Sequence, residues 1–277
     1  MDELNLLIDY HYNSKFPVLV DVGAHHGCVS STFAKKGWKV IAFEPENQNR
    51  EAFIQNLINF ENVTCIPKAV SDVTGAKVPF YVSDEHYGIH SLTSWHKTHK
   101  LAYEVETVRL DDVLIELQIA SVTLLKIDIE GADFLALKSF DFVKYQPELI
   151  MTEFMDERTK PSFGYTHHDV VCYMKDYGYT AFVSEWEDIK EYGREGVATP
   201  PHLWIQCVPY PLDHEPAWGN LIFVPNSDQE KFSITLEKYL KQLKKAEQQA
   251  DLRNLAKKIP GAKQLYNLVK SVILDKQ

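Results

Sequence analysis

Cysteine is scarce in this 277-residue sequence, and the cysteines that are present are widely spaced. Cys28, Cys65, Cys172 and Cys207 form no C-x-x-C pair. This spacing argues against a disulfide framework and against a structural zinc site. A chain with free, scattered thiols is suited to a reducing compartment, so a cytoplasmic location is expected.

Long apolar runs are also missing, and no membrane-spanning segment is expected. The opening stretch MDELNLLIDYHYNSK carries acids where a secretory signal needs Lys or Arg, and its apolar part is too short. We therefore expect no secretory leader.

Positive charge is in deficit, with 29 Lys and Arg against 39 Asp and Glu, a formal net charge of −10. Because phosphate neutralisation dominates nucleic-acid affinity, no nucleic-acid partner is expected. Only the end of the chain is basic: residues 251–277 contain six Lys or Arg and two Asp, a net of +4.

Apolar runs alternate with helical patterns along the first half of the chain, which predicts a doubly wound α/β sheet. Two further strands, 76–82 and 103–110, are expected to flank a polar, histidine-rich loop at 83–100, and residues 186–219 are expected to form a long loop. We predict a main domain at 1–227 and a helical C-terminal extension at 228–277. The strands expected in the main sheet are 16–24, 38–44, 62–70, 122–131, 147–154, 178–185 and 220–225, and the helices between them are 29–37, 47–60 and 132–140.

Acidic residues end the predicted parallel strands. They are Asp21, Glu44, Asp128, Glu130 and Glu153. Ligands of open parallel sheets bind at the carboxyl ends of the strands, so these acids are expected to surround a binding site. An acid after the second strand can accept hydrogen bonds from the ribose hydroxyls of NAD or of S-adenosylmethionine.

The loop after the first strand, VDVGAHHG, lacks the G-x-G-x-x-G pattern of dinucleotide sites. It has Gly23 and Gly27 with His25 and His26 between them, and Asp21 precedes it. A pyrophosphate needs close backbone approach and no adjacent acid, whereas the ammonium and sulfonium of S-adenosylmethionine favour an acidic cleft. The loop therefore favours S-adenosylmethionine over NAD.

Six motifs together resemble the FkbM family of methyltransferases over residues 17–155: VDVGAHHG, AFEPE, AVSD, ETVRLDDVL, LLKIDIEGAD and PELIMTEF. The resemblance implies a class I methyltransferase fold, with a seven-stranded, mostly parallel sheet, one reversed strand near its C-terminal end, and helices on both faces. It also implies S-adenosylmethionine as the cofactor and a hydroxyl acceptor on a sugar, glycan or secondary metabolite.

By the same resemblance, the first loop flanks the methionine part of the cofactor, Glu44 with Pro45 holds the ribose, and the AVSD motif lies near the adenine. Asp128 and Glu130 face the reaction centre. In the histidine-rich loop, His90 stands where the family often has a serine. The cofactor residues implied are Asp21, Gly23, Ala24, His25, Gly27, Glu44, Pro45, Ser71, Asp72 and Asp128.

A hydroxyl acceptor is a weak nucleophile, so a general base is expected within hydrogen-bond reach. Glu130, Glu153 and His90 are the candidates, and Glu130 could equally orient its loop. No metal site is predicted, because the histidines at 83–100 fit a solvated lid better than the oxygen-rich sites that Mg²⁺ prefers. A divalent ion stays an alternative.

Three alternatives stay open from the sequence. The chain could be an NAD(P)-dependent oxidoreductase, or a binding module that has lost catalysis. The apolar stripes after residue 228 could pack on the domain, form a homodimer or make weak contact with a membrane surface. The identity of the small-molecule or glycan acceptor is not readable from loop sequences.

Overall fold

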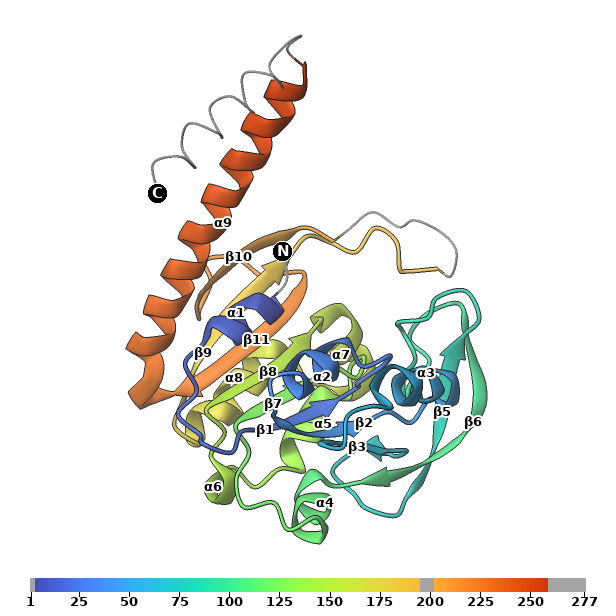
Figure 1. The fold of residues 1–277 in the computed structure, drawn as a ribbon. Helices are drawn as coiled ribbons and strands as arrows, with labels where there is room; N and C mark the ends of the chain where they lie inside the picture. The colour runs from blue at the N-terminus through green and yellow to red at the C-terminus, as the bar shows by residue number, and fades with distance from the viewer. Residues whose placement is uncertain (1–2, 195–201, 259–277) are drawn as a thin grey trace.

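The computed structural model of the protein describes residues 3–194 and 202–258 (Figure 1). The last part of the predicted C-terminal extension, residues 259–277, lies outside these residues. The strands are β1 Val18–Val22, β2 Lys39–Phe43, β3 Val63–Ile66, β4 Ala69–Val70, β5 Lys77–Ser83, β6 His99–Val108, β7 Leu124–Ile127, β8 Leu149–Phe154, β9 Tyr179–Trp186, β10 Trp204–Pro209 and β11 Trp218–Pro225. The helices are α1 Glu3–Asp9, α2 Cys28–Ala34, α3 Asn47–Leu57, α4 Leu110–Glu116, α5 Asp133–Lys138, α6 Phe142–Tyr145, α7 Asp156–Phe163, α8 His167–Asp176 and α9 Gln229–Lys258.

The main sheet of the described residues has the strand order β10-β9-β11-β8-β7-β1-β2-β3. Strands β3, β2, β1, β7 and β8 pair in parallel, and β11 is antiparallel to both β8 and β9. This is the class I methyltransferase arrangement that was expected, extended at one edge. The strand count was wrong: β10 lies within the predicted loop 186–219 and pairs antiparallel with β9, so the sheet has eight strands and two of them are reversed.

Strand β1 shows why the first apolar run is continuous. All five of its residues are buried. Val18, Val20 and Val22 belong to one hydrophobic core, whereas Leu19 belongs to the core on the opposite face of the sheet. Each buried Val or Leu side chain stabilises the fold by about 1.5–3 kcal/mol relative to exposure. A polar residue in this strand must therefore have a buried partner.

Helices α7 and α8 follow β8, where no helix was predicted. Pro161 lies within α7 and obscured its helical pattern, because proline is expected to end a helix. Helix α8 begins with a capping box, in which Thr166 and Asp169 satisfy each other's backbone N–H groups. The segment is therefore helical above the carboxyl end of β8.

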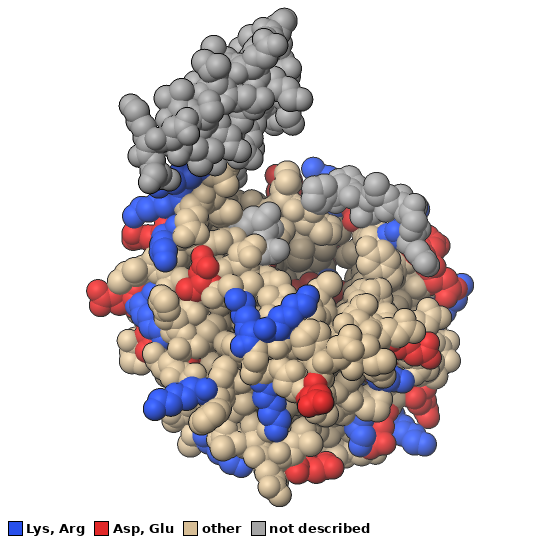
Figure 2. Space-filling model, viewed as in Figure 1, with Lys and Arg blue, Asp and Glu red and all other residues tan. Residues whose placement is uncertain are grey.

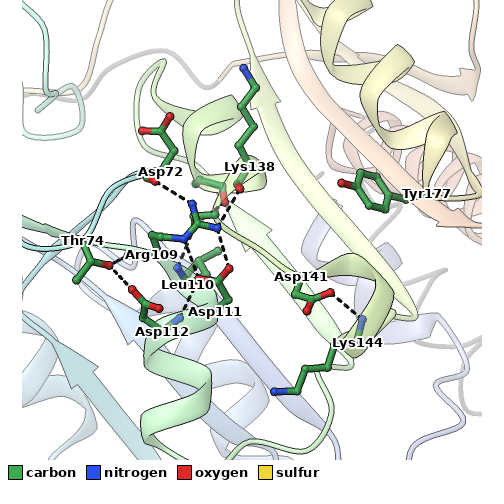
Figure 3. Close-up of polar contacts among 12 residues, drawn as sticks. Asp72, Thr74, Arg109, Leu110, Asp111, Asp112, Lys138, Asp141, Lys144 and Tyr177 are labelled. Carbon is green, nitrogen blue, oxygen red and sulfur yellow. Dashed lines mark hydrogen bonds and ion pairs between the residues drawn. The ribbon is translucent and has the colours of Figure 1, made fainter.

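A second, three-stranded sheet of order β4-β6-β5 carries the histidine-rich loop. The RLDD motif joins this sheet to the main domain (Figure 3). Arg109 donates to the carbonyl oxygens of Asp72 (2.8 Å) and Lys138 (3.4 Å), and its guanidinium pairs with Asp111 (2.7 Å). Thr74 donates to Asp112. This motif therefore has a structural role, fixing the entry to α4.

Helix α9 begins where the C-terminal extension was expected and extends away from the body of the molecule (Figure 1). Its first turns are buried against the core through Phe232, Leu236 and Tyr239. No helix in the described ranges is long and apolar enough to cross a membrane.

Candidate functional site

A cavity of about 540 Å³ lies at the carboxyl ends of β1, β2 and β7. A volume of this size suits a cofactor or small-molecule ligand. The loop after β1, the end of β2, residues 68–70 before the second sheet, the histidine-rich loop and the loop after β7 all contribute to its wall. Figure 2 shows a hollow in the face of the molecule that is turned to the viewer.

The glycine loop after β1 is shaped by close backbone approach. Gly23 has a left-handed φ of 79°, and a Cβ there would lie 1.9 Å from the carbonyl oxygen of Asp128. The amides of Gly23 and Ala24 both donate to the carbonyl oxygen of Phe43. Only glycine fits between the two neighbouring strand ends, so the loop fixes the distance between β1, β2 and β7.

Gly27 has a different role from the one expected. A Cβ there would lie 2.3 Å from Leu57 Cδ1 and 2.9 Å from Phe53 of α3. Gly27 is not part of the cavity wall. It is the N-cap residue of α2 and has a left-handed φ of 84°. This glycine therefore allows α2 and α3 to pack closely, and its expected contact with a cofactor is not supported.

Glu44 at the end of β2 lines the cavity and is 5% exposed. Its Oε2 accepts a hydrogen bond from the His25 amide (2.7 Å) and its Oε1 accepts one from the Glu46 amide (2.9 Å). Burial raises the pKa of this carboxyl to about 7, against the opposing effect of the two amides. Each oxygen keeps a second lone pair, so the group can also accept hydrogen bonds from a ligand.

Asp21 does not line the cavity, so it makes no direct contact with a ligand there. Its side chain is fully buried, accepts a hydrogen bond from Ser30 (2.7 Å) and lies 3.4 Å from the ammonium of Lys126. Lys126 in β7 also donates to the carbonyl oxygen of Gly23 (2.8 Å) and lies 3.6 Å from Asp128. Lys126 offsets the charge of Asp21, and together they fix the glycine loop.

The acids after β7 and β8 surround a buried guanidinium. The NH1 group of Arg158, in α7, lies 2.7 Å from Glu130 and 2.6 Å from Glu153. The guanidinium carbon is also 4.4 Å from the centre of the Trp95 ring. Burial raises the pKa of both carboxyls, and Arg158 opposes that rise. Glu130 lines the cavity, whereas Glu153 lies behind it on the same guanidinium and is not part of the cavity wall.

The side chain of Asp133 holds the turn that carries Glu130. Asp133 accepts hydrogen bonds from the amides of Ile129 (3.2 Å) and Gly131 (2.9 Å). Glu130 itself has a left-handed φ of 58°, a conformation that few non-glycine residues adopt. The turn therefore aims the Glu130 side chain at a cost in backbone strain.

The histidine-rich loop contributes to the cavity wall and is partly packed: His86 and Ser91 are buried, whereas Asp84, Glu85 and Lys97 are exposed. His86 is 4% exposed, and its ring lies near those of His96 and Tyr192. Ser91 connects the loop to the acidic turn, the turn after β7 that carries Asp128 and Glu130, by donating a hydrogen bond to the carbonyl oxygen of Glu130 (3.0 Å). The loop is therefore held to the site to whose wall it contributes.

His90 lines the cavity, and its hydrogen bonding argues against the expected role as a base. Its Nδ1 accepts a hydrogen bond from the Ser83 amide (3.2 Å), and burial lowers its pKa. The neutral ring therefore carries its proton on Nε2 and can donate a hydrogen bond, but it has no free lone pair for a proton.

The predicted site residues divide into two groups. Eight lie on the cavity wall: Gly23, Ala24, His25, Glu44, Pro45, His90, Asp128 and Glu130. Five lie outside it: Asp21, Gly27, Ser71, Asp72 and Glu153. Within the AVSD motif, Ala69 and Val70 lie on the cavity wall, whereas Ser71 and Asp72 do not, and the carbonyl oxygen of Asp72 accepts a hydrogen bond from Arg109.

Sequence reasoning missed three charged residues of the site. Lys126 belongs to the KIDIEG motif, and a lysine in an otherwise apolar buried strand was an available signal. Arg158 and Glu3 had no such signal. Glu3 lines the far end of the cavity and accepts hydrogen bonds from Ser184 (2.8 Å) and Asn220 (3.0 Å).

Solved structures with related folds include three methyltransferases. Precorrin-6y C5,15-methyltransferase from Geobacter metallireducens is 14% identical, with a TM-score of 0.41 over 79% of this chain and 86% of that chain. An rRNA methylase from Streptococcus thermophilus is 11% identical, with a TM-score of 0.42 over 80% and 93%. Magnesium protoporphyrin IX methyltransferase from Synechocystis, with bound S-adenosylmethionine, is 11% identical, with a TM-score of 0.37 over 79% and 74%. Similarities this low carry no argument about the reaction.

No curated protein matches the sequence. Residues 21–181 match the methyltransferase FkbM domain, and this range includes the glycine loop, Glu44, the acidic turn and α7. The match favours S-adenosylmethionine over the NAD(P) alternative. This chain therefore belongs to the FkbM family of S-adenosylmethionine-dependent methyltransferases.

Proposed function

We propose that this protein is an O-methyltransferase that acts on a hydroxyl group of a sugar, a glycan or a secondary metabolite. The observation that carries the proposal is the carboxyl of Glu130 on the cavity wall. Burial raises its pKa well above the usual range of a glutamate. A carboxylate of raised pKa is a stronger base, and a hydroxyl acceptor needs a base more than an amine acceptor does.

In the proposed reaction, the acceptor oxygen attacks the methyl carbon of S-adenosylmethionine and the carbon–sulfur bond breaks. The electron pair of that bond stays on sulfur, which gives S-adenosylhomocysteine. The hydroxyl proton passes to Glu130 as the new carbon–oxygen bond forms. Arg158 and the turn held by Asp133 keep the Glu130 carboxylate in place, so the protein contributes mainly position and a proton acceptor.

For the cofactor, we propose that Glu44 accepts hydrogen bonds from the ribose hydroxyls. The loop at Gly23, Ala24 and His25 would lie against the methionine part, with Asp128 near its ammonium. Their shared position on the cavity wall supports this assignment. Lys68, together with Ala69 and Val70 of the AVSD motif, replaces Ser71 and Asp72 as the proposed adenine wall.

Cofactor binding is tested by calorimetric titration with S-adenosylhomocysteine, with NAD in parallel. We expect binding of S-adenosylhomocysteine alone, and a loss of at least about tenfold in Glu44→Ala, because hydrogen bonds to a charged group contribute about 1.5–3 kcal/mol each. Glu44→Gln, which keeps one carbonyl oxygen, is expected to lie between the two. Absence of binding by the wild type would favour a non-catalytic module.

The reaction is tested with methyl-labelled S-adenosylmethionine and a panel of sugars, polyols and phenolic metabolites, each paired with its amine analogue. We expect label in a hydroxyl-bearing acceptor, transfer that increases with pH as Glu130 ionises, and loss of transfer in Glu130→Gln with cofactor binding retained. Transfer only to the amine analogues, or full activity of Glu130→Gln, would contradict the proposal.

A further inference from the structure

Two clusters of metal-ligating side chains occur among the described residues, and only one of them already contains a cation. Each cluster offers three ligand atoms that lie within 4.8 Å of one another. In the first, made of Asp128, Glu130 and Glu153, the guanidinium of Arg158 lies within 2.7 Å of two of the carboxylates. The second consists of His167, His168 and Glu215 and lies outside the cavity wall.

The second cluster joins two segments that are distant in the sequence. His167 and His168 open helix α8, and Glu215 lies in the loop between β10 and β11. The two imidazole rings have their centres 4.0 Å apart, and His168 Nε2 lies 3.3 Å from Glu215 Oε1. His168 and Glu215 are 46% and 76% exposed, so an ion pair between them contributes little by itself.

The side chain of His167 is oriented as a metal ligand is. Its Nδ1 lies 2.7 Å from Asp156 Oδ2, and its backbone amide donates to Oδ1 of the same carboxylate (2.7 Å). A carboxylate at Nδ1 keeps the proton there and leaves the lone pair on Nε2, which is how metal-binding histidines are commonly held. His167 is 2% exposed, and no described residue is a hydrogen-bond partner of its Nε2.

His168 is held at its Nδ1 by a hydroxyl, which can donate or accept and therefore fixes the orientation of the ring but not its tautomer. Its Nδ1 lies 2.6 Å from the hydroxyl of Tyr210, which leaves Nε2 on the side of Glu215. The helix N-terminus at this point opposes a cation, but Asp156 and Asp169 add negative charge beside it. The cluster therefore combines two imidazoles of fixed orientation with a carboxylate.

We propose that His167, His168 and Glu215 bind a divalent transition-metal ion, with Zn²⁺ the best match. Two imidazole nitrogens and one carboxylate oxygen are a known ligand set for zinc, with one coordination position left for water. Magnesium and calcium prefer sites made of oxygen atoms. The ion would clamp the start of α8 to the loop between β10 and β11, and it has no part in the proposed methyl transfer.

The site is tested on the full-length protein after chelator treatment, by calorimetric titration with Zn²⁺ alone and with Mg²⁺ alone. We expect one Zn²⁺ per chain, no comparable Mg²⁺ binding, and a loss of at least tenfold in affinity in His168→Ala and in Glu215→Gln. His214→Ala is the matched control, because it removes a half-exposed histidine beside Glu215 that is not in the cluster. Its affinity should match that of the wild type.

Exposed thiols are a competing source of zinc binding, so Cys172→Ser, in the next turn of α8, is titrated alongside. Melting curves give an independent measurement: Zn²⁺ should raise the Tm of the wild type and of His214→Ala, but not that of His168→Ala. The proposal is overturned if no Zn²⁺ binds, if His168→Ala binds it as tightly as the wild type, or if binding is lost in Cys172→Ser alone.

Discussion

The strongest test of the site's electrostatics is to remove the charge of Arg158. Its guanidinium is 2% exposed and lies within 2.7 Å of both Glu130 and Glu153. Arg158→Met keeps a long apolar side chain but leaves two buried carboxyls without their cation. Breaking a buried pair in this way costs about 3–5 kcal/mol. At about 2–4 °C per kcal/mol, the Tm should fall by about 6–20 °C near neutral pH.

The effect of pH on this variant gives the sharper signature. Burial already raises the folded-state pKa of both carboxyls, and Arg158 is the largest opposing influence. Without Arg158 both pKa values rise further above the unfolded value of about 4.3. A carboxyl with a raised folded pKa loses stability as pH rises through that pKa, so the Tm difference between variant and wild type should be small near pH 4.5 and large near pH 8.

The assay is a series of circular-dichroism melts across that pH range. Arg158→Lys keeps the charge but not the planar fork, and it should lose less stability than Arg158→Met. Lys100→Met, which removes an exposed partner of Asp84, is the control and should show no measurable change. A Tm loss in Arg158→Met that is the same at every pH would refute the electrostatic reasoning and indicate a packing defect.

Three further predictions concern the loops of the site. Gly23→Ala should be strongly destabilising in thermal melts because its Cβ would overlap the carbonyl oxygen of Asp128, whereas Gly75→Ala, with the same left-handed backbone but open space, should lose only about 1–2 kcal/mol. The rate of methyl transfer by the wild type should increase with pH through the raised pKa of Glu130, and Glu130→Gln should lose both the rate and that pH dependence while its affinity for S-adenosylhomocysteine is unchanged. His90→Gln, which keeps a donor near the Nε2 position, should retain more activity than His90→Ala; equal losses would exclude a donor role for His90.

Local patterns determined the central strands and the position of the site. Strands β1, β2, β7 and β8 are short apolar runs bounded by turn residues, and their carboxyl ends meet at one edge of a parallel sheet. The acids that follow them therefore had to gather there, whatever the rest of the chain did. This is why Glu44, Asp128 and Glu130 could be placed near a ligand from the sequence.

Contacts between segments distant in sequence decided the chemical state of those acids, and no pattern in one strand can encode them. Lys126 offsets the charge of Asp21, and Arg158 pairs with Glu130 and Glu153. Loop 210–216 folds back against the start of α8, which brings histidines and a carboxylate together over 47 residues of sequence. The eighth strand has the same origin, because β10 is stable only through its pairing with β9.

The sequence by itself thus determined the fold class, the family and the edge of the sheet where the cavity lies, because these depend on periodicity and on motifs of a few adjacent residues. Only the tertiary structure decided which carboxylates face the cavity, which are neutralised inside the protein, and that the Nε2 of His90 can donate a hydrogen bond. The physical reason is that charge state and proton position depend on burial and on partners within about 4–6 Å in space, at any separation along the chain.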